Sequence, residues 1–127
     1  MNTEKVIFAF FIILAATLNF GFFLGEIHDA QHHNVYELFA ALVISLIATV
    51  MKFGDRTHLG AVLLATSLVA DFQLIVAACL WGYGTNISDT GLDGELVASV
   101  VSMSGGALLA NMISVVLLVV ETITVRR

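Results

Sequence analysis

The residue whose type and position most clearly point to chemistry is Asp71, which lies in the middle of a long apolar segment. Counted from Leu59, where that segment starts, Asp71 is about 18 Å along a helix, close to the middle of a bilayer. A carboxylate at that depth must find hydrogen-bonding partners or take up a proton. Polar side chains at similar depths in the sequence are Ser45, Gln73, Asn111 and, somewhat further outward, Asn19. Together with Asp71 they form the predicted site for a proton or a monovalent cation.

A structural role explains the same residues. A protonated Asp71 that is hydrogen-bonded to Asn111 or Asn19 would hold helices in register and move nothing. Both interpretations stay open at the level of the sequence.

Three histidines within six residues, His28, His32 and His33, form a second group of chemically active side chains. On a helix His28 and His32 would share a face, and Asp29 would lie beside His33. Imidazole and carboxylate groups at this spacing can bind a divalent metal or sense external pH. A solvated polar loop explains the same residues, because no further ligand at a fixed spacing completes a closed metal site.

The composition predicts that these groups work in a membrane. Of the 127 residues 59% are hydrophobic and 12% are charged, against roughly 25% charged in soluble domains. No proline-rich linker divides the chain, so we expect one transmembrane domain over residues 1–127. Cys79 is the single cysteine, which excludes an internal disulfide. The sequence shows no nucleophile with its base, phosphate loop, haem pair or nucleotide motif, so no enzyme, cofactor or nucleic-acid partner is expected.

Four apolar segments are long enough to cross a bilayer, which takes roughly 20 helical residues. They cover residues 6–25, 35–51, 59–83 and 96–125. The predicted fold is therefore all-α, a four-helix transmembrane bundle. All five basic residues fall on one side of this topology, and they are Lys5, Lys52, Arg56, Arg126 and Arg127. Because basic residues mark the cytoplasmic side, both termini are predicted to be cytoplasmic.

Short connections and small residues predict how these helices end and pack. Gly54 suits a left-handed helix end, and Asp55 or Thr57 suits the start of the next helix. In the first segment Gly21 and Gly25 form a GxxxG pair. In the last segment small residues recur at every fourth position, and this small-residue ridge consists of Ala98, Ser102, Gly106, Ala110 and Ser114. Such patterns serve packing within one subunit or contacts between subunits, and we expect the former.

Two stretches of the chain carry a resemblance to known proteins. Val35 to Ala41 reads Val-Tyr-Glu-Leu-Phe-Ala-Ala, and residues 52–57 read Lys-Phe-Gly-Asp-Arg-Thr. The chain thereby resembles a family of small uncharacterised bacterial inner-membrane proteins with four helices over their whole length. The resemblance implies the bacterial inner membrane as the setting and carries over no activity or binding residues. Small multidrug transporters share the size and helix count, but their key acid is a glutamate in the first helix, where this chain has no acid within the membrane.

Two functions from different classes follow. The first is a small oligomeric membrane protein, a channel or transporter, that handles a proton or a monovalent cation through Asp71. Oligomerisation is expected because four short helices alone enclose little room for a water-filled path. The second is a non-conducting accessory subunit that docks on a larger membrane transport complex through the small-residue ridge of the last segment.

Overall fold

The computed structural model describes residues 3–25, 29–54 and 57–125. Within these ranges the chain forms four α-helices, which are α1 (Thr3–Phe23), α2 (Val35–Lys52), α3 (His58–Asn86) and α4 (Gly94–Val125). One short 3-10 helix, η1 (Ala30–His32), precedes α2, and no strand occurs in the described ranges. All four α-helices are long and apolar enough to cross a membrane. The all-α four-helix prediction is confirmed, and the chain is a multi-pass membrane protein.

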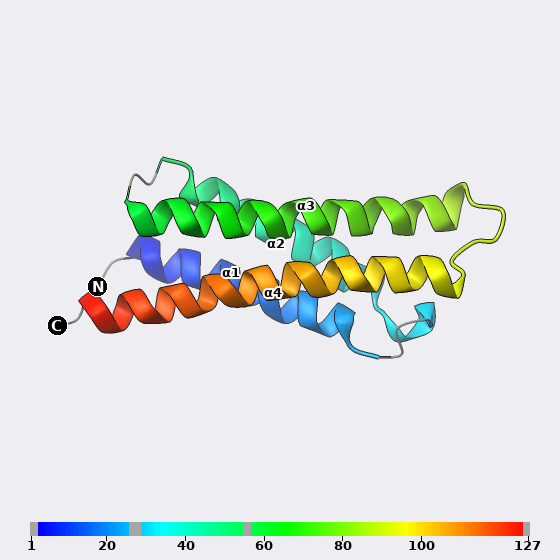
Figure 1. Cartoon of the computed structure of the whole chain (residues 1–127), viewed down its shortest axis with the longest axis horizontal. Coiled ribbons are helices and arrows are strands. Elements are labelled where there is room, and N and C mark those ends of the chain that lie inside the picture. Colours follow the sequence, from blue (N-terminus) through cyan, green and yellow to red (C-terminus); the bar gives the residue numbers. More distant parts are fainter. Residues whose placement is uncertain (1–2, 26–28, 55–56, 126–127) are drawn as a thin grey trace.

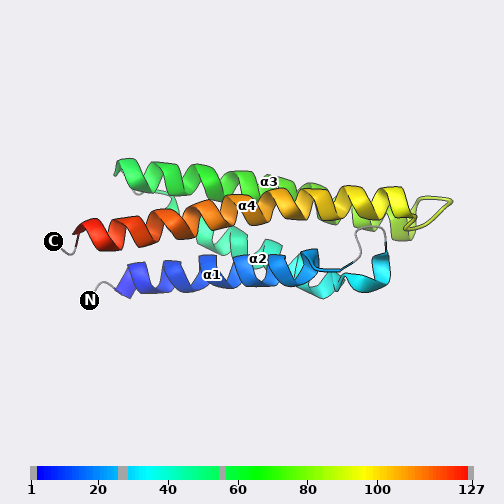
Figure 2. The same ribbon diagram turned by 60° about the horizontal axis from the view of Figure 1, so that its bottom comes forward.

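The helices run up and down, and each packs against two neighbours (Figures 1 and 2). α1 packs against α2 and α4, and α3 packs against the same two helices. The start of α1 and the end of α4 lie at one end of the bundle, here called the termini end (Figure 1). The connection between α3 and α4 lies at the opposite end, here called the hairpin end. At the termini end Lys5 Nζ of α1 lies 2.7 Å from Glu121 Oε2 of α4.

Capping side chains and glycines determine where the helices start and stop. The Asn34 side chain accepts a hydrogen bond from the Tyr36 backbone N–H at 2.9 Å at the start of α2. Thr57 Oγ1 accepts from the Gly60 backbone N–H at 2.9 Å at the start of α3. Gly54 follows α2 with a φ of 91°, as predicted for a left-handed position. Asp55, the other predicted cap, lies outside the described residues.

The helices differ in length, and this difference shapes both ends of the bundle. α2 has 18 residues and is about 27 Å long, whereas α3 has 29 and is about 44 Å long. The α3–α4 hairpin therefore extends beyond the other helices at the hairpin end (Figure 1). At the termini end α2 stops short of the level where α3 begins, which Figure 1 also shows.

The buried apolar side chains form two separate clusters. The termini-end cluster consists of Phe8, Ile12, Ala48 and Leu63. The hairpin-end cluster is larger and consists of Phe22, Leu38, Ala41, Ala70, Leu74, Ala77, Trp81, Val97, Val100, Val101, Ala107 and Ala110. Large apolar side chains also remain exposed on the outer surface, among them Phe10, Phe72 and Leu109. A surface of this kind suits helices surrounded by lipid.

Candidate functional site

Asp71 of α3 is held against α2 by two hydroxyl groups. Its side chain is only 4% exposed. Ser45 Oγ donates a hydrogen bond to Asp71 Oδ1 at 2.6 Å, and Thr49 Oγ1 donates to Oδ2 at 2.5 Å. Ser45 and Thr49 are four residues apart in α2, so they lie one turn apart on the same helix face. One carboxyl group therefore ties two turns of α2 to α3.

Thr49 has a second acceptor within reach. Its Oγ1 also lies 2.9 Å from the main-chain oxygen of Ser45. A threonine hydroxyl has one proton, so it cannot make a full hydrogen bond to both oxygens. The Thr49 proton is therefore shared between Asp71 Oδ2 and the Ser45 main-chain oxygen, and this one hydroxyl links the backbone of α2 to the carboxyl of α3.

Two buried polar side chains near this level have unused hydrogen-bonding atoms. Asn111 of α4 and Ser67 of α3 are both fully buried. Within the described part of the chain, neither amide atom of Asn111 has a hydrogen-bond partner. The Ser67 hydroxyl has none there either. Buried polar atoms without partners are costly and uncommon in proteins. Their oxygens are therefore free to serve as ligands.

The packing of α4 on α3 gives the level of Asn111. Thr66 Oγ1 lies 2.5 Å from Ser114 Oγ, and an ideal Cβ on Gly106 would lie 2.6 Å from Gln73 Nε2. In this antiparallel register Asn111 lies between the levels of Ser67 and Asp71, within about one turn of each. We call the buried residues at this level the polar layer, and its members are Ser45, Thr49, Ser67, Asp71 and Asn111.

The other two residues of the predicted ion site lie elsewhere. Asn19 of α1 is fully buried toward the hairpin end, where its amide lies 2.6 Å from Ser104 Oγ of α4 in either orientation of the amide. Gln73 packs on Gly106, and its Oε1 has no hydrogen-bond partner among the described residues. The structure therefore brings Ser45 to Asp71, aligns Asn111 with them in depth, and gives Asn19 a separate partner.

Thr49 is the member of the site that the sequence reasoning missed. It follows Ser45 by four residues, so the shared helix face was available as a signal. Ser67 likewise precedes Asp71 by four residues in α3. A search for hydroxyl residues one turn from each candidate would have found both.

The small-residue ridge packs within the chain over part of its length. Gly106 accommodates Gln73, Ala110 is buried in the hairpin-end cluster, and Ser114 contacts Thr66. The remaining two members are less covered, since Ser102 is exposed and Ala98 is half-buried. The centre of the small-residue ridge therefore packs against α3 of the same chain. Little of the ridge is left exposed for contact with a partner subunit.

The predicted glycine pair of α1 does not form a helix face. Gly21 lies in α1, and a methyl group there would overlap the Glu37 carboxylate of α2. Gly25 lies beyond the last residue of α1, Phe23, and has a φ of 106°. The expectation that Gly25 packs within a helix was wrong, because this glycine follows the end of α1 in a left-handed conformation.

The histidine cluster is only partly described. His28 and the side chain of His32 lie outside the described residues. His33 is buried, with Nδ1 at 2.5 Å from the Phe22 main-chain oxygen and its ring 5.4 Å from the Phe22 ring. In the part of the chain that the structure describes, no group of three potential metal ligands occurs. The metal site stays a prediction from the sequence.

Comparison with known proteins identifies a family. A family model described as a family of unknown function (DUF6394) matches residues 32–122. Neither a curated protein nor a solved structure matches the chain. The match covers α2, α3 and most of α4, and so includes the whole polar layer. It confirms the predicted resemblance to an uncharacterised family, and because it spans well over half of the 127 residues, the chain belongs to this family of unknown function, DUF6394.

Proposed function

We propose that the chain is a small, non-enzymatic membrane protein that binds a proton or a monovalent cation at Asp71 and moves it across the membrane. The observation that carries this proposal is the buried carboxyl of Asp71 with a hydroxyl on each oxygen. Acidic side chains inside membranes are expensive, and in transport proteins they mark ion paths and proton relays.

The partners of Asp71 favour reversible binding over a fixed ion pair. Among the described residues its hydrogen-bond partners are hydroxyl groups, and no basic side chain forms a salt bridge with it. Hydroxyl oxygens can donate to a carboxylate, accept from a carboxylic acid, or coordinate a small cation. The unused oxygens of Ser67 and Asn111 at the same level add neutral ligands. This set of oxygens suits a proton or a dehydrated monovalent cation.

The two apolar clusters support the same function. They lie on either side of the polar layer, so the site is separated from both ends of the bundle. A carrier or gated channel needs such barriers, because a continuous open path would let ions leak. Four helices alone enclose little room for a water-filled path to a buried side chain, so we propose that the working form is a homo-oligomer or a larger membrane complex.

We also propose that the protein lies in the bacterial inner membrane with both termini in the cytoplasm. The start of α1 with Lys5 and the end of α2 with Lys52 lie at the termini end of the bundle (Figure 1). The α3–α4 connection with Asp89 and Asp93 and the start of α4 with Glu95 lie at the hairpin end. Basic residues are retained on the cytoplasmic side of bacterial membranes, which supports this orientation.

Ion flux into liposomes that contain the purified protein tests the proposed function. A pH-sensitive dye inside the vesicles would report proton movement, and radioactive sodium or rubidium would report cation movement. Asp71→Asn should leave the protein folded and abolish the flux, because the amide cannot exchange a proton or neutralise a cation. Asp89→Asn, in the exposed loop, is the matched control and should conduct like the original chain. Equal flux in both variants would remove the proposal.

A further inference from the structure

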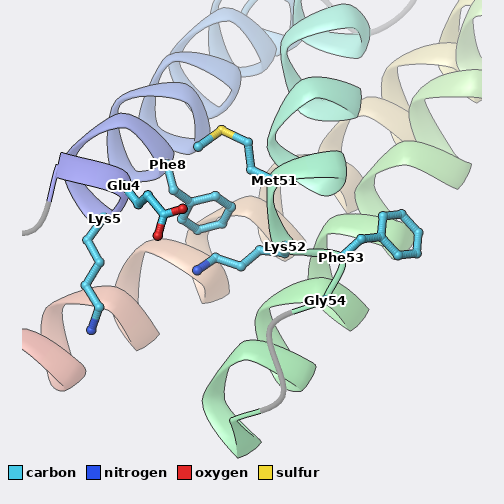
Figure 3. Close-up of a pocket in the computed structure, with 7 residues that line it drawn as sticks. All are labelled: Glu4, Lys5, Phe8, Met51, Lys52, Phe53 and Gly54. Atoms are coloured by element: carbon cyan, nitrogen blue, oxygen red, sulfur yellow. The ribbon is translucent and has the colours of Figure 1, made fainter.

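A cavity of about 500 Å³ opens at the termini end of the bundle. It lies between the start of α1 and the end of α2, where α2 stops short of its neighbours. Glu4, Lys5, Phe8, Met51 and Lys52 line it together with the first two residues after α2. Figure 3 shows the Glu4 and Lys52 side chains approaching each other beside the Phe8 ring. Lys52 Nζ lies 4.3 Å from the centre of that ring.

The cavity comes close to the polar layer along α2. Met51 and Lys52 follow Thr49 by two and three residues, which is about 3 to 5 Å along the helix axis. Thr49 itself is 4% exposed and donates to Asp71. Part of the cavity wall and the Thr49 partner of Asp71 therefore lie within one turn of α2.

Apolar side chains close the site on both sides. Toward the termini end Leu63 and Leu59 of α3 extend the apolar region to about 18 Å from Asp71 along the axis. Toward the hairpin end the apolar region of α3 continues to Trp81, about 15 Å from Asp71. The cavity enters the termini-end barrier, because Phe8 and Met51 line the cavity and also pack in the termini-end cluster.

We propose that this cavity is the vestibule through which the proton or cation reaches Asp71, and that Phe8 forms the constriction between them. The inference rests on the proposed function, since it names the route to the same site. Glu4 supplies the wall with a carboxylate beside Lys5 and Lys52, while Phe8 is 1% exposed and closes the inner end. Lys52 lies over the Phe8 ring, where a cation–π contact favours the closed position. Rotation of the ring would open the inner end of the vestibule toward the turn of α2 that carries Thr49.

Chemical labelling tests the route without any need for ion flux. In a Cys79→Ala background, Thr49→Cys is exposed to a membrane-impermeant trimethylammonium methanethiosulfonate added to one side of sealed vesicles. Phe53→Cys, in the connection at the termini end, identifies the side from which the vestibule opens. Thr49→Cys should react from that side, and Phe8→Ala should increase the rate about tenfold by removing the constriction. Phe10→Ala, on the exposed face of α1, is the matched control and should leave the rate unchanged.

Flux measurements then separate this inference from the proposed function. Phe8→Ala should raise the Asp71-dependent flux several-fold, and Phe10→Ala should not. If Phe8→Ala fails to fold, as judged by Trp81 fluorescence, Phe8→Leu replaces it with a smaller increase expected. Three outcomes would overturn the vestibule even where Asp71→Asn abolishes flux. In the first Thr49→Cys reacts only from the hairpin end, in the second it reacts from neither side, and in the third the Phe8 and Phe10 variants show equal rates. Unchanged flux in Asp71→Asn would instead overturn the proposed function, while the labelling result still reports whether the cavity leads to Thr49.

Discussion

The amide of Gln73 on α3 occupies the space that a side chain at residue 106 of α4 would need. An ideal Cβ on Gly106 would lie 2.6 Å from Gln73 Nε2 and 2.7 Å from Oε1. Glycine at this position therefore lets the two longest helices approach closely near their middle. Because α3 carries Asp71 and α4 carries Asn111, this contact helps to determine the level at which the two residues face the bundle interior.

Gly106→Leu should lower the free energy of unfolding by about 1 to 3 kcal/mol, since the larger side chain must displace Gln73. Unfolding in mixed detergent micelles, followed by circular dichroism, measures the change. Gly82→Leu is the control, because no atom lies within 4 Å of a Cβ built there. Adding Gln73→Ala to Gly106→Leu should restore part of the loss. An equal effect at residues 106 and 82 would contradict the close contact.

Thr49→Val should destabilise the bundle by about 0.6 to 1.7 kcal/mol, which runs from the average to the largest value for hydrogen bonds between helices in membranes. Valine keeps the shape of threonine but leaves Asp71 Oδ2 without its donor. Ser45→Ala removes the donor to Oδ1 and should act in the same range. Thr17→Val is the control, since the Thr17 hydroxyl bonds to Leu14 O of its own helix. If residues 49 and 17 respond alike, the contact with Asp71 contributes nothing to stability.

Asn19 and Ser104 should behave as an energetically coupled pair that joins α1 to α4. Asn19→Ala and Ser104→Ala each remove one side of the 2.6 Å contact. The double variant should therefore lose less stability than the two single losses added together, by about 0.5 kcal/mol or more. A double-mutant cycle of unfolding free energies measures this difference. Strict additivity would show that the two side chains do not stabilise each other.

Reporter fusions should place the two ends of the bundle on opposite sides of the membrane. Green fluorescent protein fused after Arg127 should fluoresce, and alkaline phosphatase fused at the same point should be inactive, as for a cytoplasmic terminus. Alkaline phosphatase inserted after Ser88, in the α3–α4 connection, should be active. The reverse pattern would contradict the orientation inferred from the basic residues.

The sequence was sufficient for the fold class and for the approximate helix ends. The first span was expected over residues 6–25 and is α1, Thr3–Phe23; the second was expected over 35–51 and is α2, Val35–Lys52. This agreement has a physical cause. In lipid each backbone polar group must be bonded within its own segment, so a long apolar run has few alternatives to a helix. Gly25 shows the limit, because a glycine can either pack within a helix or follow its end, and spacing alone does not distinguish these roles.

The depth of each polar residue was likewise readable from the sequence, since every helical residue advances about 1.5 Å along the axis. That rule is enough to group Ser45, Asp71 and Asn111 at one depth. It does not say which way a side chain points around its helix. Asn19 was grouped with Asp71 by depth, yet the rotation of α1 turns it toward Ser104.

Only the tertiary structure decided the partners of Asp71. Thr49 became part of the site because the rotation of α2 presents the Ser45 and Thr49 face to α3. The short length of α2 relative to α3 also created the cavity beside Phe8 and Lys52. Helix rotation and register depend on how side chains of different helices fit together, as Gln73 fits Gly106. Contacts of this kind join residues far apart in the chain, so no local pattern specifies them.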